Sequence, residues 1–168
     1  MTDKSSLRFA LATDAAAIAA VVNLAYQVED FFKIGDRTDV AEIEQLLAKD
    51  AFIVADLEAG ELAGAVYVRA SPPRGYFGML SVQPAMQGAG LGRKLIDAAE
   101  QYCGERGCTE MDLSVVNLRT ELPAFYGRLG YGYSGTQPWP QDELHRISRP
   151  AHFITMTRRI ESGAPTRR

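Results

Sequence analysis

Residues 75–102 read GYFGMLSVQPAMQGAGLGRKLIDAAEQY and carry the strongest fold signal in the chain. The first eight residues, Gly75–Val82, are rich in aromatic and branched side chains, as is typical of a strand. Pro84 ends that strand, and a glycine-rich turn follows over residues 87–92. From Leu91 onward, apolar residues recur at helical spacing. The stretch therefore predicts a strand, a glycine-rich turn and a helix that begins directly after the turn.

The glycine-rich turn stands where many proteins bind phosphate. The first backbone N–H groups of a helix have no partner within the helix, and the helix dipole adds partial positive charge there. A dinucleotide-binding GxGxxG motif would need a third glycine where Arg93 or Leu95 stands, and the GKS or GKT end of a P-loop is missing. The pattern that fits is QxxGxG, with Gln87, Gly90 and Gly92.

Strands and helices are predicted on both sides of this stretch. Upstream they are a strand from Leu7, helices that begin after Asp14 and Asp39, and a hairpin of strands Ala51–Leu57 and Leu62–Ala70. Downstream they are a strand Met111–Val116, a short helix Pro123–Leu129, and strands Tyr131–Gly135 and His152–Ile160. The strand–helix–strand connection makes Gly75–Val82 and Met111–Val116 parallel. We expect one α/β domain over residues 1–161 and a flexible tail over 162–168.

The composition excludes several classes of protein. The 168 residues are 46% hydrophobic and 23% charged, which suits one globular domain rather than a disordered chain. A net charge of −3 gives no reason to expect binding to nucleic acid or to an anionic membrane. No apolar run approaches the roughly 20 residues of a membrane span, and no stretch resembles a signal peptide, so we expect a cytoplasmic protein. Two cysteines and two histidines predict no metal site.

Three motifs make the sequence similar to the GNAT superfamily of acyl-CoA-dependent N-acetyltransferases. Residues 78–84 and 87–92 resemble its central strand and pyrophosphate loop, Asn117 matches a position that often contacts CoA, and residues 125–131 (FYGRLGY) resemble its [FY]YxxxG[FY] segment. The resemblance implies a single-domain GNAT fold, α/β, with a mixed central sheet of six to seven strands and about four flanking helices. The implied order is strand, two helices, three strands, helix, strand, helix and two strands. The central strand would carry a bulge and splay from its parallel neighbour.

The resemblance also implies acetyl-CoA as co-substrate, held largely by main-chain groups. The implied cofactor-binding residues lie on the central strand, in the glycine-rich loop and beyond the next strand: Leu80, Ser81, Val82, Gln87, Gly88, Ala89, Gly90, Leu91, Gly92, Arg93, Asn117 and Tyr126. Tyr126, four residues before Gly130, matches the family's general acid, which assists departure of the CoA thiolate. The implied course is direct attack by a primary amine within a ternary complex.

The acceptor side is less marked in the sequence. Glu29 and Asp30 stand among aromatic residues in the loop that would border the acceptor in the implied fold. An acid beside aromatic rings suits an amine, so Glu29 is the candidate base, with Tyr26, Glu29 and Phe32 as candidate substrate contacts. Asp112, Glu110 or a chain of waters are alternatives for the base. The sequence leaves the acceptor open between a small amine, an amino acid and a peptide N-terminus. It also leaves open whether the protein forms a homodimer, and whether it is instead a non-catalytic CoA-binding module.

Overall fold

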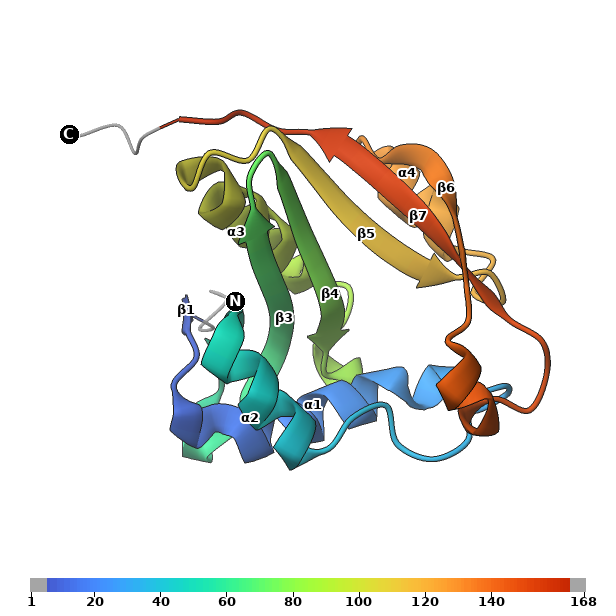
Figure 1. Ribbon diagram of the computed structural model, residues 1–168. Helices are drawn as coiled ribbons and strands as arrows, with labels where there is room; N and C mark the ends of the chain where they lie inside the picture. The colour runs from blue at the N-terminus through green and yellow to red at the C-terminus, as the bar shows by residue number, and fades with distance from the viewer. Residues whose placement is uncertain (1–5, 164–168) are drawn as a thin grey trace.

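The computed structural model describes residues 6–163, which form one seven-stranded mixed sheet with helices on both faces (Figure 1). The strands lie side by side in the order β1-β2-β3-β4-β5-β7-β6. Their bounds are β1 Leu7–Phe9, β2 Ala51–Asp56, β3 Leu62–Ser71, β4 Arg74–Val82, β5 Glu110–Val116, β6 Gly132–Pro138 and β7 His152–Arg159. β4 and β5 are parallel, as the strand–helix–strand connection predicts, whereas the other pairs are antiparallel.

Four α-helices and several short 3-10 segments complete the described part of the chain. The helices are α1 Ala15–Ala25, α2 Val40–Lys49, α3 Leu91–Glu105 and α4 Leu122–Arg128, and two of the 3-10 segments matter below, η2 Tyr26–Glu29 and η5 Gln141–Arg146. The predicted order of strands and helices is confirmed. None of the helices within residues 6–163 is long and apolar enough to cross a membrane. Most of the expected flexible tail, residues 164–168, lies outside the described residues.

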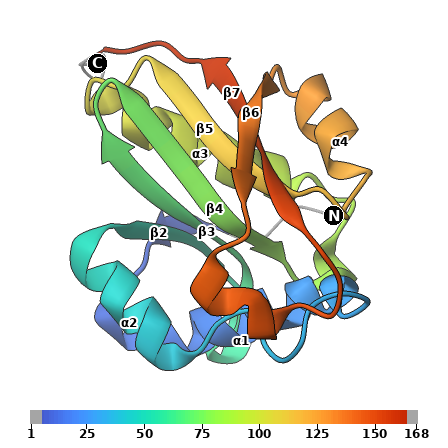
Figure 2. The same ribbon diagram turned by 45° about the vertical axis from the view of Figure 1, so that its right-hand side comes forward.

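Two hydrophobic clusters, one on each face of the sheet, hold the layers together. Figure 2 shows the helices on the two faces of the sheet. α1 and α2 cover one face, where Ile18 and Ile43 are fully buried. α3 and α4 cover the other face, where Leu95 is fully buried. Because β3 is covered on both faces, its side chains are buried without alternation from Leu62 to Val68. The sheet is therefore the middle layer of three, and any opening within it connects its two faces.

Strand β4 carries a bulge on the side of β3. The pairing changes register between Ala65 and Tyr67, which face Ser81 and Gly78, so that β4 contributes one more residue than β3 over this interval. Within it, Met79 adopts a φ of +50°, in the left-handed region that is uncommon for residues other than glycine. The bulge implied by the family resemblance is present.

On its other side, β4 separates from β5. The two strands pair only over Arg74–Tyr76 and Glu110–Asp112, and beyond these residues they diverge (Figure 1). The splay implied by the resemblance is therefore also present. It leaves the second half of β4 without a ladder partner on the side of β5, so its main-chain groups on that side are available to other partners.

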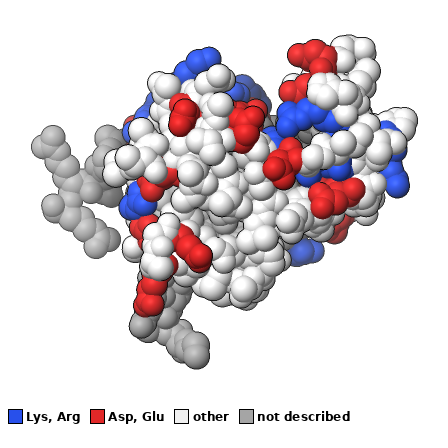
Figure 3. Space-filling model, turned by 90° about the horizontal axis from the view of Figure 1, so that it is seen from below, with Lys and Arg blue, Asp and Glu red and all other residues white. Residues whose placement is uncertain are grey.

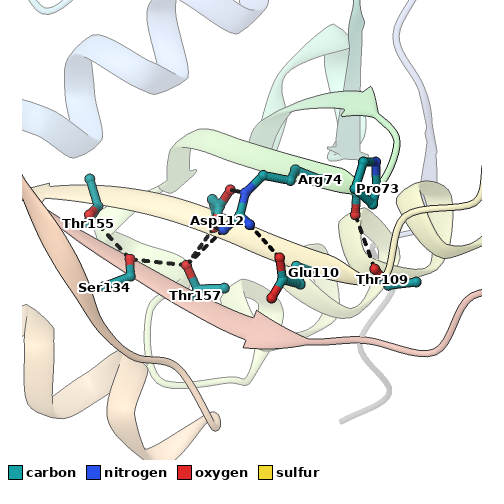
Figure 4. A network of polar contacts seen from close by, with 8 residues as sticks. All are labelled: Pro73, Arg74, Thr109, Glu110, Asp112, Ser134, Thr155 and Thr157. Carbon is teal, nitrogen blue, oxygen red and sulfur yellow. Dashed lines mark hydrogen bonds and ion pairs between the residues drawn. The ribbon is translucent and has the colours of Figure 1, made fainter.

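A polar network fixes the paired end of β4 and β5 (Figure 4). The guanidinium of Arg74 donates to both carboxylate oxygens of Asp112 at 2.7 Å and also bonds Glu110. On the far side of Asp112, the Thr157 hydroxyl donates to the same carboxylate at 2.6 Å and links it to Ser134. Asp112 and Glu110, the alternatives for a catalytic base, are thus held by Arg74 at the paired end of the strands.

Two loops that are far apart in sequence join beside the divergent end. The Ile34 N–H donates to the Arg146 carbonyl at 2.9 Å, and the Ser148 N–H donates to the Phe32 carbonyl at 2.8 Å. These bonds hold the loop after η2 against the segment that follows η5, and Figure 2 shows η5 in front of the end of α1. The C-terminal third of the chain therefore contributes one wall beside the opened strands.

Candidate active site

A cleft of about 1080 Å³ lies between the diverging parts of β4 and β5. On the face covered by α3 and α4 it is lined by the glycine-rich loop, the start of α3 and α4. On the opposite face it is lined by η2, the loop that follows it, and η5. One cavity therefore extends from the predicted cofactor loop to the predicted acceptor loop, through the gap in the sheet.

The glycine-rich loop has the geometry of an anion site. Gly88 and Gly90 adopt φ values of +88° and +83°, and Gly90 is the N-cap of the 15-residue helix α3. A side-chain carbon added at either glycine would meet no atom of residues 6–163 within 4 Å, so conformation rather than packing requires glycine there. The Gln87 side chain donates to the Val82 carbonyl at 3.3 Å and ties the loop to the end of β4. Free N–H groups, helix dipole and open space together suit a diphosphate.

The bulged half of β4 forms the floor of the cleft. Leu80 and Val82 line it together with Met79. Ser81, between them, is buried, and its hydroxyl donates to the Met79 carbonyl at 2.9 Å. That bond braces the bulge from the side away from the cleft. The strand therefore presents main-chain groups to the cleft in a fixed conformation, as an extended ligand that adds a strand would require.

Tyr126 on α4 brings a phenol to the same cleft. Its ring is only 7% exposed and packs against Phe77, Phe125 and Tyr131, with centroids 6.0, 5.0 and 6.2 Å away. Among residues 6–163 its hydroxyl has no hydrogen-bond partner. Burial raises the pKa of this phenol, and the neighbouring Tyr26 phenol raises it further. Tyr126 is therefore protonated at neutral pH and can donate to a group in the cleft.

Glu29 on η2 is a buried carboxylate on the opposite face. Its oxygen lies 3.0 Å from Nη1 of Arg119, whose Nε bonds Glu121 at 2.6 Å. Burial raises the pKa of Glu29, although the positive charge of Arg119 opposes the shift. The result is a carboxylate that accepts a proton more readily than an exposed glutamate does. The pairing spans 90 positions in the chain, so no local pattern in the sequence could indicate it.

Aromatic rings enclose the side of the cleft formed by η2, the loop after it and η5, the predicted acceptor side. Burial raises the pKa of Tyr26 to about 12, and Tyr76 on β4 is likewise held in its neutral form by burial, which raises its pKa. Trp139 stacks on Phe153 with centroids 5.0 Å apart and planes 13° apart, and its indole N–H donates to the Glu143 carbonyl at 3.0 Å. The walls therefore combine apolar rings with neutral hydroxyl groups.

Eight of the eleven predicted cofactor residues other than Tyr126 line the cleft, as do Tyr26, Glu29 and Tyr126. Those eight are Leu80, Val82, Gln87, Gly88, Gly90, Leu91, Gly92 and Arg93. The Arg93 side chain also pairs with Asp97 at 3.3 Å. Four predicted residues do not line it: Ser81, Ala89, Asn117 and Phe32. Main-chain contacts of Ser81 and Ala89 with a cofactor stay a prediction, because both stand between residues that do line the cleft.

The structure gives Asn117 and Phe32 other contacts. The Asn117 side-chain oxygen accepts from the His152 N–H at 2.8 Å, while its own N–H donates to the His152 carbonyl at 2.9 Å. Asn117 thus fixes the start of β7. Phe32 is 1% exposed and packs edge-on against Phe31, so it supports the acceptor loop from below.

The sequence did not single out several residues of the acceptor side. That side is lined by Arg37, Tyr76, Arg146 and Phe153. The only sequence feature that could have pointed to this region is Trp139, the one tryptophan of the chain, which stands between two prolines. Residues 6–163 contain no group of three histidine, cysteine, aspartate or glutamate side chains arranged to bind a metal ion.

Comparisons with known proteins agree with this fold. Residues 21–131 match the family model described as "Acetyltransferase (GNAT) family". Over 109 residues the chain is 31% identical to a mycothiol acetyltransferase of Propionibacterium freudenreichii subsp. shermanii; this covers 58% of the chain but 35% of that protein, so the chain spans about a third of that relative's length.

Solved structures with low sequence identity share the fold. The ribosomal-protein-S18-alanine N-acetyltransferase from Escherichia coli has a TM-score of 0.74 at 15% identity and covers 98% of this chain and 99% of its own. The ribosomal-protein-alanine N-acetyltransferase from Brucella melitensis has a TM-score of 0.72 at 21% identity, with 92% and 99% covered. The family model matches well over half of the residues of this chain, so the chain belongs to the GNAT acetyltransferase family.

Proposed function

We propose that the protein transfers an acetyl group from acetyl-CoA to a primary amine, by direct attack while both substrates are bound. The observation that carries the proposal is the single cleft through the sheet, with a phosphate-type glycine loop at one end and a buried carboxylate at the other. Membership of the acetyltransferase family supports the same reaction. Such a cleft lets two substrates approach from opposite faces and meet between β4 and β5.

The cofactor end has the groups that acetyl-CoA needs. In our proposal the N–H groups at the start of α3 hold the diphosphate, with Gly88 and Gly90 allowing the main chain to approach it. The unpaired half of β4 receives the pantetheine arm through the main chain near Leu80 and Val82. A β4 N–H that points at the thioester oxygen would stabilise the developing oxyanion by about 3–4 kcal/mol.

Glu29 and Tyr126 divide the proton transfers between them. Glu29 removes a proton from the ammonium form of the acceptor, which frees the nitrogen lone pair to attack the thioester carbon. As the C–N bond forms and the C–S bond breaks, Tyr126 donates its proton to the departing sulfur and regains one from solvent. The products are an amide, free CoA thiol and one proton. Ordinary phenol and thiol pKa values differ by roughly two units, and burial raises that of Tyr126 further above the thiol's. The position of Tyr126 therefore matters more than its acid strength.

The proposal is tested by binding and turnover together. We expect calorimetry to give saturable heat with CoA, and we expect CoA thiol to appear when acetyl-CoA is mixed with an accepting amine from a broad panel. Binding of CoA without thiol release from any amine would favour the non-catalytic module instead. The absence of binding to CoA and to acetyl-CoA would remove both functions.

A further inference from the structure

We propose that the acceptor carries a carboxylate next to its amine, as an amino acid does, and that the guanidinium of Arg37 binds this carboxylate. The inference deepens the proposed function, on which it rests, by naming the chemical class of the acceptor. It follows from the charges on the acceptor side of the cleft rather than from any relative.

Arg37 is a cation that no carboxylate in residues 6–163 holds closely. Its nearest acidic partner is Glu42, with Nη1 and Oε1 4.0 Å apart. The same Glu42 oxygen already accepts a hydrogen bond from the Thr38 hydroxyl at 2.5 Å. The Arg37 side chain is about one-third exposed and lines the cleft, with its guanidinium 5.5 Å from the centre of the Tyr26 ring. A partly desolvated guanidinium with free donors favours a bound anion.

The other basic residues on this side of the cleft have nearer partners. Arg119 bonds Glu29 and Glu121, with its nearest contacts at 3.0 and 2.6 Å. Lys33 pairs with Asp30 at 3.2 Å, and Arg146 pairs with Glu143 at 3.5 Å. Figure 3 shows charged side chains of both signs beside one another on the right of the underside, whereas the centre of that face carries few charges. In the part of the chain that the structure describes, Arg37 is therefore the cation on the acceptor side whose acidic partner is most distant.

Arg37 lines the same cleft as Glu29, the group that would receive the amine. Its positive charge lowers the pKa of Glu29, and it acts on the pKa values of Tyr26 and Tyr76 in the same direction. A cation and a carboxylate so placed complement a zwitterion, with its ammonium at Glu29 and its carboxylate at Arg37. A planar guanidinium can bind a carboxylate through two parallel hydrogen bonds, which also fixes the direction of the amine.

The test compares acceptors that differ only in this charge. Each of the twenty protein amino acids is assayed beside its own α-carboxamide by release of CoA thiol. For the amino acids that are acetylated, we expect kcat/KM to exceed that of the matching amide by about tenfold to a hundredfold, as loss of a charge-assisted bond implies. In Arg37→Gln this ratio should fall to about one, and Arg37→Lys should restore part of it.

Arg106→Gln is the matched control. Arg106 also lies over a tyrosine ring, that of Tyr102 at 3.5 Å, but it caps the far end of α3 and does not line the cleft. We expect it to leave the ratio unchanged. Equal kcat/KM for amides and amino acids, or an Arg37→Gln ratio equal to that of the parent protein, would overturn the inference while leaving acetyl transfer in place.

A binding measurement separates this inference from the proposed function. Saturation-transfer NMR of the same amino acids and amides, with CoA present, reports acceptor binding without turnover. Binding that favours the carboxylate and is lost in Arg37→Gln would support the inference even if no amine released thiol, in which case the proposed reaction alone would fail. If neither turnover nor binding favours the carboxylate, the inference is wrong.

Discussion

The two ends of the β4–β5 pair differ although they belong to the same two strands. At one end, three residue pairs form a parallel ladder, and Arg74 bridges the strands to Asp112. At the other end, a bulge at Met79 turns β4 away and a cleft opens. The paired end is fixed by side chains, and the open end leaves main-chain groups for a ligand. The sheet is therefore continuous at the paired end of β4 and β5 and is open at the other end, where the cleft lies.

The largest expected effect comes from Gly90→Glu at the open end. The new residue would be strained at a φ of +83° and would place a negative charge where the diphosphate is proposed to bind. We expect CoA affinity, measured by calorimetry, to fall by about a hundredfold or more. Gly60→Glu is the control, because Gly60 has a φ of +77° and equally open surroundings but lies in the β2–β3 turn. Unchanged affinity in Gly90→Glu would mean that the loop does not bind CoA.

The next effect is that of Tyr126→Phe, which keeps the ring that packs on Phe77 and removes the hydroxyl. We expect kcat to fall by about tenfold to a hundredfold while the Kd for CoA changes less than about twofold. Tyr131→Phe serves as the comparison, since the Tyr131 hydroxyl is buried and lacks a hydrogen-bond partner among residues 6–163. Its removal should raise the free energy of unfolding by about 1 kcal/mol and leave kcat unaltered. Equal kcat in Tyr126→Phe and the parent protein would exclude Tyr126 from the chemistry.

The pH dependence of the reaction tests the carboxylate at the acceptor end. A base works when ionised, so kcat/KM should rise with pH through the pKa of Glu29, which burial holds above its ordinary value. Because Arg119 lowers that pKa, Arg119→Gln should move this acid limb to higher pH. Glu29→Gln should abolish the limb and lower kcat/KM about tenfold or more. An acid limb at the same pH in Arg119→Gln and the parent protein would show that Glu29 is not the base.

The raised pKa of Glu29 also makes the free energy of unfolding depend on pH. The folded protein holds the pKa of Glu29 above that of the unfolded chain, so the protonated carboxyl favours folding. This contribution is present at low pH and is lost as the pH rises through the folded-state pKa. Replacing Glu29 by glutamine should therefore reduce the loss of stability over that pH range, as measured by urea unfolding at a series of pH values.

The smallest effect is expected at the paired end. Arg74→Ala removes the bond to Asp112, but the Arg74 side chain is half exposed and water screens the pair, so we expect a loss of about 1 kcal/mol or less. Hydrogen exchange should quicken at the Arg74–Tyr76 amides and stay unchanged in Arg8→Ala. Arg8 also bonds two carboxylates, those of Asp14 and Asp56, but lies in β1. A large loss of CoA affinity in Arg74→Ala would show that the two ends are not independent.

Local patterns in the sequence predicted the strands, the helices and the glycine-rich loop. Gly88 and Gly90 stand within a few residues of the strand and helix that they connect, so one short window contains both the turn and the helix start. Asp39 illustrates the limit of such signals. It caps α2 by accepting the Glu42 N–H at 2.8 Å, in agreement with the helix predicted to begin after Asp39. The sequence did not indicate that the Glu42 side chain accepts a hydrogen bond from the Thr38 hydroxyl.

Most of the predicted acceptor side could not be predicted from the sequence, because segments that are far apart in the chain form it. Glu29 meets Arg119 across 90 positions, and the Phe32 carbonyl meets Ser148 across 116. Neither pairing leaves a spacing that a single sequence reveals. Asn117, a position taken from the family resemblance, holds the start of β7 through His152, and its contact with CoA stays a prediction.

The most direct measurement is the backbone amide NMR spectrum of isotope-labelled protein as CoA is added. We expect the largest shift changes at the amides of Gly88–Gly92 and Leu80–Val82, with those of Arg74–Tyr76 nearly unmoved. Saturable changes that spare the glycine-rich loop, or no change at all, would contradict a cofactor site at the open end of β4 and β5.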